Sequence, residues 1–244
     1  MKKVLIIIVL CLLVGYLIFS IFYFREKPKE GVCSKFEVEL QNASKNDVFV
    51  YIEDIEKSVK EAGLDPTGKQ FKDINTSTIE EAIQTNQFVK KAHVFVTNNG
   101  AIKALIEERE PILRVMNNDG KSYYIDNEGQ MMPLSKRFTA YLPIATGAIK
   151  EDFATGDLYK FALFLHNNIF WNAQIEQIIV QSDRDIRLIP RVGEHQIVLG
   201  DLNDYKQRLD KLMTFYEKGL NEVGWNKYSV INLSFDKQVV CTKR

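Results

Sequence analysis

The sequence predicts an α+β protein in which one N-terminal transmembrane helix precedes two folded domains. Three observations support this prediction. Residues 4–24 form an uncharged apolar run, residues 34–110 follow the pattern strand–helix–helix–strand–strand, and residues 111–244 show mainly strand patterns interrupted by two helical ones. We expect the boundary between the two domains at Pro111.

Residues 4–24 have the length and composition of a membrane span. A helix of this length covers about 30 Å, the thickness of the bilayer's hydrocarbon core. A cleavable signal peptide is the alternative, but its apolar core is usually only about 7–15 residues long. The charged stretch 25–28 also offers no small-residue cleavage site. We therefore expect an uncleaved anchor between a short tail, residues 1–3, and a spacer, residues 25–33.

The charges that flank the apolar run do not fix its orientation. Lys2 and Lys3 lie on one side, and Arg25, Lys27 and Lys29 lie on the other. A very short tail before a long domain is nevertheless the arrangement of a signal anchor. We therefore expect the N-terminus inside the cell and the bulk of the chain outside the membrane.

The exported part has nearly balanced charge. Leaving Lys2 and Lys3 out of the 32 basic residues gives 30, against 32 acidic residues and a net charge of −2. This balance argues against a nucleic-acid-binding surface. Cys33 and Cys241 are the cysteines outside the apolar run. An oxidising compartment would permit a disulfide between them, but two unpaired thiols are the interpretation we favour.

The first domain begins with an alternating strand pattern at residues 36–40. A helix follows from Ile52 and ends before Gly63, and a second is expected at residues 77–85. Ser77 and Glu80, three positions apart, suggest a capping box at the start of this second helix.

Two strands complete the first domain, at residues 89–97 and 101–108. Asn98, Asn99 and Gly100 lie between them, and these residue types favour the positive φ angles of a tight hairpin turn.

The second domain alternates strands with two helices. Strands are expected at residues 112–116, 121–125, 175–182, 185–190, 196–199, 229–235 and 238–242. Helices are expected at residues 158–170 and 202–223. Phe161, Leu165 and Ile169 form the apolar face of the first of these helices.

Two short motifs flank the expected domain boundary. Residues 107–112 read EEREPI, and residues 124–129 read YIDNEG. Their order and spacing resemble the FtsQ/DivIB family of bacterial cell-division proteins. The motif residues, to which we assign a structural role, are Glu108, Arg109, Pro111, Asp126 and Gly129. The N-terminal anchor, Leu142-Pro143 with Gly147, and residues 231–235 fit the same family.

The resemblance implies a POTRA domain at residues 34–110 and the family's β domain at residues 111–244. It also implies a single-pass inner-membrane protein with a cytoplasmic N-terminus and a periplasmic bulk, located at the division septum. Its expected role is that of a scaffold that binds FtsB/DivIC-like and FtsL-like single-pass proteins. Through them it would help recruit and regulate the septal peptidoglycan synthase complex.

In this family a partner pairs with the last strand of the β domain. Carried over by position, the candidate edge-strand residues are Phe235, Lys237, Gln238, Val239 and Val240. An exposed strand edge offers free N–H and C=O groups to an incoming strand.

The sequence carries no pattern that is typical of an enzyme. His93, His166 and His195 are too far apart for a metal-binding motif, and we expect no cofactor, metal or small-molecule substrate. Glu107 and Glu108 are neighbours on a predicted strand and should point to opposite faces. We expect Tyr123, Tyr124 and Trp171 to be packing residues. The alternative class is a membrane-anchored exported enzyme that acts on cell-wall polymers.

Overall fold

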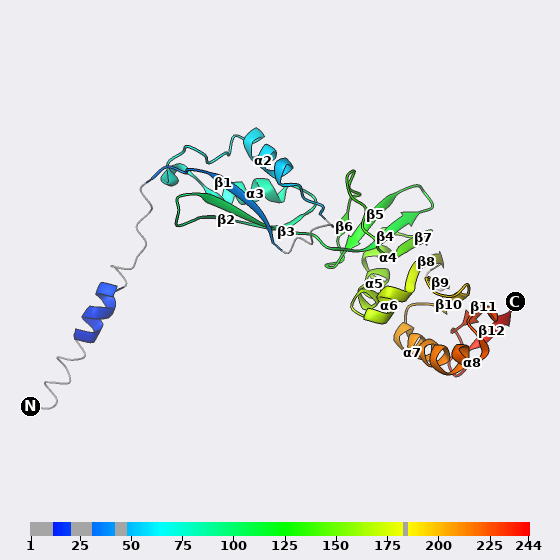
Figure 1. The fold of residues 1–244 in the computed structure, drawn as a ribbon. Helices are drawn as coiled ribbons and strands as arrows, with labels where there is room; N and C mark the ends of the chain where they lie inside the picture. The colour runs from blue at the N-terminus through cyan, green and yellow to red at the C-terminus, as the bar shows by residue number, and fades with distance from the viewer. Residues whose placement is uncertain (1–11, 21–30, 42–47, 183–184) are drawn as a thin grey trace, which may run out of the picture. The chain divides into compact units, whose positions relative to one another are not determined.

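The computed structural model describes residues 12–20, 31–41, 48–182 and 185–244. The chain forms two compact units, coloured along the chain in Figure 1. The first unit contains the described residues up to Glu39, with residues 52–85 and 92–106. The second contains the described part of residues 40–51, residues 86–91 and the described residues from Glu107 to the end.

The predicted membrane helix lies largely outside the described residues. Of residues 4–24, the stretch 12–20 is described, and it is helical. Within the described ranges, no helix combines the length and the apolar character that crossing a membrane requires. The tail 1–3 and most of the spacer 25–33 also lie outside the described residues.

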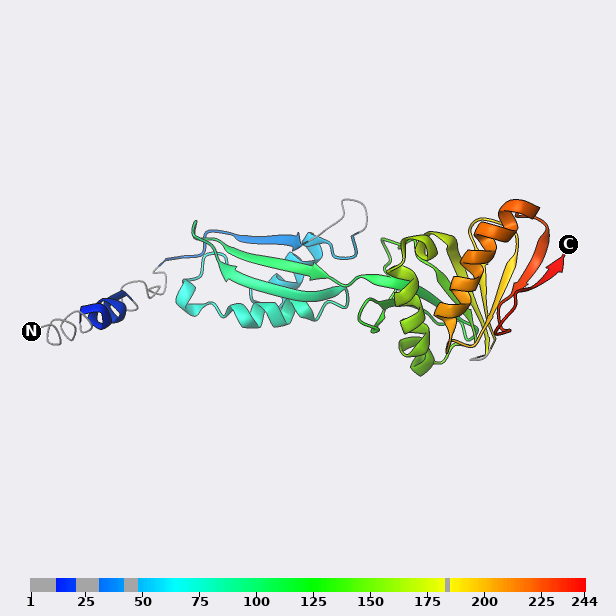
Figure 2. The ribbon, with the colours of Figure 1, turned by 90° about the horizontal axis from the view of Figure 1, so that it is seen from below.

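The first unit is built on a three-stranded sheet of order β1-β3-β2. Its strands are β1 (Phe36–Gln41), β2 (Val89–Val96) and β3 (Ile102–Glu108). Its helices are α2 (Ile52–Glu61), the single 3₁₀ turn η1 (Phe71–Asp73) and α3 (Thr76–Gln84). Figure 2 shows α2 and α3 on one face of the sheet. Apart from η1, the order of elements is the predicted strand–helix–helix–strand–strand.

Local signals in the sequence explain the turns of this unit. Gly63 ends α2 with a φ of 71°, in the left-handed region that glycine adopts without strain. The hairpin turn between β2 and β3 is confirmed. Gly100 has a φ of 80°, and the Thr97 N–H donates to the Ala101 carbonyl at 2.8 Å.

The predicted capping box at Ser77 is wrong. Asn75 caps α3, and its Oδ1 accepts hydrogen bonds from the N–H groups of Ser77 and Thr78 at 3.1 and 3.4 Å. An Asn carboxamide oxygen serves this role as well as a Ser hydroxyl does. Glu80 does not turn back to the helix start; its Oε1 accepts from the Val94 N–H on β2 at 2.6 Å. The carboxylate therefore ties α3 to the sheet.

The second unit is built on a nine-stranded mixed sheet of order β12-β11-β10-β9-β8-β7-β4-β5-β6. The strands are β4 (Pro111–Asn117), β5 (Ser122–Asp126), β6 (Met131–Met132), β7 (Ile144–Gly147), β8 (Ile175–Ser182), β9 (Asp185–Pro190), β10 (Gln196–Gly200), β11 (Tyr228–Asn232) and β12 (Val240–Lys243). The pairs β4–β7, β7–β8 and β10–β11 are parallel, and the others are antiparallel. Strands β6 and β7 were not predicted.

Helices cover this sheet, with α5 and α7 prominent in Figure 2. The helical elements are α4 (Glu151–Thr155), α5 (Asp157–His166), α6 (Ile169–Gln174), α7 (Tyr205–Phe215), the π-helical turn η2 (Tyr216–Leu220) and α8 (Asn221–Val223). The helix predicted from Leu202 thus starts at Tyr205, and α4 was not predicted.

The single helix predicted at residues 158–170 is wrong. It is broken into α5 and α6, because Asn168 leaves the helical conformation and its side chain accepts from the Trp171 N–H at 3.0 Å. The break rotates α6, so that Ile169 is 93% exposed and Trp171 is buried. Asn168 lies within a continuous helical pattern of apolar residues, but it caps α6 and does not continue α5.

Side chains on the two faces of β5 enter different cores. Tyr123 and Ile125 pack into the main apolar core with residues of β8, α5 and α7. Tyr124, between them, points to the opposite face and packs with Phe49 and Met132. The Phe49 and Tyr124 rings meet edge to face at 5.8 Å. Strand alternation alone produces this division, and it buries β5 on both sides.

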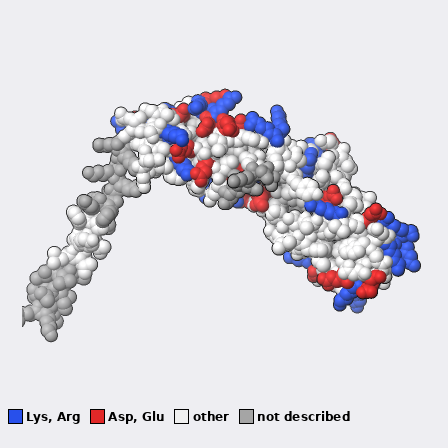
Figure 3. All heavy atoms as spheres, in the orientation of Figure 1, with Lys and Arg blue, Asp and Glu red and all other residues white. Residues whose placement is uncertain are grey.

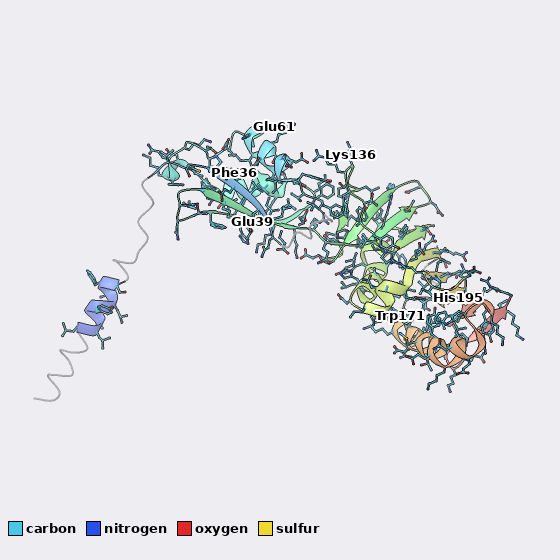
Figure 4. The ribbon with its side chains drawn as sticks, in the orientation of Figure 1. Phe36, Glu39, Glu61, Lys136, Trp171 and His195 are labelled. Carbon is cyan, nitrogen blue, oxygen red and sulfur yellow. The ribbon has the colours of Figure 1, made fainter. Side chains whose placement is uncertain are left out.

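His195, labelled in Figure 4, is buried and packs against the rings of Tyr216 and Trp225. The His195 Nε2 lies 2.8 Å from the Tyr216 hydroxyl, and both residues are buried. Trp225 packs beside both rings. Gly193 permits this packing, because a Cβ there would lie 2.8 Å from the imidazole. Burial, and secondarily the charge of Arg244, lowers the pKa of His195; burial also raises the pKa of Tyr216.

This lowered pKa predicts a loss of stability in mild acid. The unfolded chain takes up a proton on His195 below about pH 6.5, where the folded protein still resists it. The free energy of unfolding should therefore fall between pH 7 and pH 5, and it should fall less steeply in His195→Gln. Urea unfolding across this range measures both slopes. Equal slopes in the wild type and in His195→Gln would contradict the assignment.

Candidate functional site

The last strand of the chain forms one edge of the nine-stranded sheet. Strand β12 pairs antiparallel with β11, with Ile231 opposite Cys241 and Asn232 opposite Val240. In the described part of the chain, no strand pairs with its other side. Cys241 packs against the main core, whereas Val240 is 41% exposed. The edge therefore combines free main-chain groups with an accessible apolar side chain.

The predicted edge-strand residues do not all lie in this strand. Val240 is the first residue of β12, while Phe235, Lys237, Gln238 and Val239 belong to the connection that precedes it. The predicted start of the strand at residue 238 is therefore wrong by two positions. Phe235 is exposed, and Val239 is partly buried against the main core.

Two polar side chains shape the connection between β11 and β12. The Asn232 Oδ1 accepts from the N–H and the hydroxyl of Ser234, at 2.9 and 2.7 Å, which ends β11 at Asn232. The Lys211 ammonium of α7 donates to the carbonyls of Leu233, Phe235 and Asp236, at 3.2, 2.5 and 3.3 Å. The predicted strand 229–235 was too long because these contacts turn the chain earlier.

A groove lies between α7 and this connection. Its volume is about 430 Å³, and it is lined by Lys211, Thr214, Phe215, Lys218, Gly219, Lys237, Gln238 and Val239. Lys218 and Lys237 are exposed. Figure 3 shows Lys and Arg side chains gathered at the end of the second unit where β12 lies. Edge and groove together offer hydrogen bonds, an apolar surface and positive charge.

The motif residues form a buried ion pair elsewhere in the second unit. The Arg109 guanidinium contacts the Asp126 Oδ2 through Nε and Nη2, both at 2.8 Å. The two side chains are 16% and 4% exposed. The remaining Arg109 donors bind the carbonyls of Gln87, at 3.1 Å, and Met131, at 2.9 Å. Arg109 therefore joins three separate segments of the chain.

Asp126 also organises the turn that follows β5. Its Oδ1 accepts from the N–H groups of Glu128 and Gln130, at 3.0 and 2.8 Å. Gly129 is required here for two reasons. Its φ is 79°, and a Cβ would lie 3.0 Å from the Tyr159 ring. The predicted spacing of Asp126 and Gly129 thus encodes a tight turn packed against α5.

The acidic residues of the first motif have separate contacts. The Glu108 Oε1 accepts from the N–H groups of Phe49 and Val50, at 2.9 and 2.6 Å. Burial raises the pKa of Glu108, and these two hydrogen bonds oppose the rise. Glu107 contacts Lys90 at 3.0 Å. The two carboxylates therefore diverge, as strand alternation predicts, and do not form a catalytic pair.

Pro111 begins β4, next to β5 in the sheet, with Asp126 as its partner residue on β5. A proline is tolerated at the first position of a strand, where it need not donate to the ladder. None of the five motif residues lies on β12.

Among the residues that the structure describes, no group of three or more His, Cys, Asp or Glu side chains is arranged to hold a metal ion. His93 is exposed, His166 lies 3.4 Å from Glu110, and His195 is buried beside Tyr216. Cys33 and Cys241 are free thiols. Tyr123, Tyr124 and Trp171 are buried packing residues, as predicted.

The fold and these motifs define an α+β protein with a POTRA-like domain followed by a larger mixed-sheet domain. Residues 31–107 match the POTRA-like domain family. Residues 110–242, more than half of the chain, match the family described as FtsQ/DivIB, C-terminal related, and the chain belongs to this family. It is 24% identical over 186 residues to the cell division protein FtsQ of Rhodothermus marinus, covering 71% of this chain and 67% of that protein.

The buried ion pair predicts an unequal response to two matched substitutions. Asp126→Asn leaves the partly exposed Arg109 guanidinium without its anionic partner, which should cost about 1.5–3 kcal/mol of unfolding free energy. Asp157→Asn removes an exposed ion pair with Lys160 and should cost less than about 1 kcal/mol. Urea unfolding at pH 7 measures both. Similar losses for the two variants would show that the motif does not hold the second unit together.

Proposed function

We propose that the chain is a non-catalytic scaffold of the bacterial division machinery. Its partners in this proposal are FtsB/DivIC-like and FtsL-like single-pass proteins, through which it helps recruit and regulate septal peptidoglycan synthesis. The observation that carries the proposal is the open edge of β12 in a member of the FtsQ/DivIB family. The name of the Rhodothermus marinus relative supports a role in cell division.

The edge would bind its partner by strand addition. An incoming strand would continue the sheet beyond β12 and take up its free N–H and C=O groups. The exposed Val240 would contact an apolar partner side chain. Lys218 and Lys237, in the groove beside the edge, would attract acidic residues that flank the partner strand. Main-chain pairing would supply affinity, and the groove would supply specificity.

Membrane anchoring would assist this contact. The apolar run 4–24 would hold the protein in the inner membrane, with its N-terminus in the cytoplasm and its bulk in the periplasm. Partners with a single span would then be confined to the same surface. Such confinement raises their effective concentration without adding any contact.

A proline scan of β12 tests the edge mechanism. Along a strand of an antiparallel pair, N–H groups alternate between the neighbouring strand and the open side. Proline substitutions at Val240, Cys241 and Thr242 should therefore fall into two classes. Where the lost N–H faces outward, partner binding should disappear while the domain stays folded; where it faces β11, stability should fall.

Binding is measured by pull-down with purified FtsB/DivIC-like and FtsL-like proteins, and folding by thermal unfolding. Retained binding in all three β12 variants would rule out strand addition at this edge.

A further inference from the structure

One side chain of α7 holds the connection that leads into β12. The Lys211 ammonium has three N–H donors, and the carbonyls of Leu233, Phe235 and Asp236 accept from it. All three donors are therefore used inside the chain. The side chain is half-buried, and its contacts lie directly before the strand whose free edge would receive the partner.

The ladder holds β12 weakly. The strand has four residues, and β11 is its neighbour at the edge of the sheet. Its register with β11 shifts between Tyr228 and Val230, so the pairing is not continuous. Contacts outside the ladder therefore determine how firmly such a short edge strand stays in place.

The far end of β12 has an anchor of its own. The Arg244 Nη2 donates to the Glu194 carbonyl at 2.7 Å, and the guanidinium also pairs with the Glu194 carboxylate. The Arg244 N–H donates to the Lys227 carbonyl at 3.3 Å. Loss of Lys211 should therefore free the start of β12 while its end stays fixed.

The start of β12 is the part that an incoming strand and the groove share. Val240 begins the strand and is 41% exposed, and Val239 packs on the main core and lines the groove. The carbonyls that Lys211 binds lie a few positions before these two residues. The ammonium thus determines the path by which the chain enters β12.

We propose that Lys211 is a positioning residue for partner binding. It fixes the path of residues 233–239, and so keeps the start of β12 and the adjacent groove in the geometry that an incoming strand meets. The ammonium acts through main-chain carbonyls and does not contact the partner. This inference rests on the strand addition proposed above, and it assigns part of the affinity to preorganisation of the edge.

A direct ionic contact with the partner is the other role that a lysine in this groove could have. Lys218 and Lys237 are exposed and suit that role, whereas the donors of Lys211 are already used. The two roles respond differently to salt. Salt screens an exposed charge contact, but it has little effect on the path of a preorganised main chain.

The affinity of the full chain, in a neutral detergent, for a purified FtsB/DivIC-like protein tests the proposal. Lys211→Met keeps the aliphatic stem and should weaken binding about tenfold or more, because a small fraction of molecules would hold the edge in the binding geometry. This loss should be nearly the same at low and at high NaCl concentration. The loss in Lys237→Gln should instead shrink as salt is added.

Lys206→Met is the matched control on the same helix. Lys206 is exposed, its ammonium lies over the Phe164 ring at 5.7 Å, and the variant should bind as the wild type does. Amide exchange of the free proteins locates the effect. In Lys211→Met, exchange should speed up more at residues 233–240 than in β8, at the centre of the sheet.

Lys211→Gln is the second variant, for the case that Lys211→Met does not fold. It supplies two neutral donors in place of three charged ones and should also weaken binding. Wild-type affinity in either folded variant, or a loss that disappears at high salt, would overturn the positioning role. Absence of binding by the wild type would overturn strand addition itself, so the two proposals fail in distinguishable ways.

Discussion

The buried ion pair between Arg109 and Asp126 joins segments that are distant in the sequence. Arg109 follows directly after β3, and Asp126 is the last residue of β5. Arg109 also binds two main-chain carbonyls, that of Gln87 just before β2 and that of Met131 in β6. A guanidinium suits this junction because its planar array of donors can serve several acceptors at once. The charge of Asp126 compensates the charge of Arg109, and neither could be buried alone without a large cost. Arg109 lies two positions before β4, which pairs with β5 and β7, so this contact adjoins the point where the chain enters the nine-stranded sheet.

The same sheet carries two surfaces of different chemistry. At one end, β12 leaves main-chain groups free beside a groove with exposed lysines. Around β4 and β5, the first motif lines a cleft together with Phe49, Phe138 and Leu142. Both surfaces depend on residues that also stabilise the fold: Lys211 holds the connection before β12, and Arg109 holds the strands beside the cleft. Glu107 and Glu108, neighbours in the first motif, make separate structural contacts.

Sequence reasoning located most strands because alternation and turn residues are local signals, as the Asn98–Gly100 hairpin illustrates. It also selected the motif residues, although only the structure shows that Arg109 contacts Asp126. Sequence reasoning failed where tertiary contacts determine the ends of a helix or the existence of a strand. Asn168 splits a continuous apolar periodicity, and Asn75 caps a helix that Ser77 also fits. Strand β7 has a short and unremarkable sequence, and its neighbours β4 and β8 define it. The role of Lys211 has no sequence signal, because its three acceptors are main-chain carbonyls more than twenty positions away.

The central claim is that β12 receives a partner strand, and amide hydrogen exchange tests it most directly. The full chain in detergent would be compared with and without a bound FtsB/DivIC-like protein. New main-chain hydrogen bonds should slow exchange in β12, where the free edge now leaves N–H groups open. Strand β6, at the opposite edge of the same sheet, should exchange at an unchanged rate. Unchanged exchange in β12 in the presence of bound partner would contradict the account.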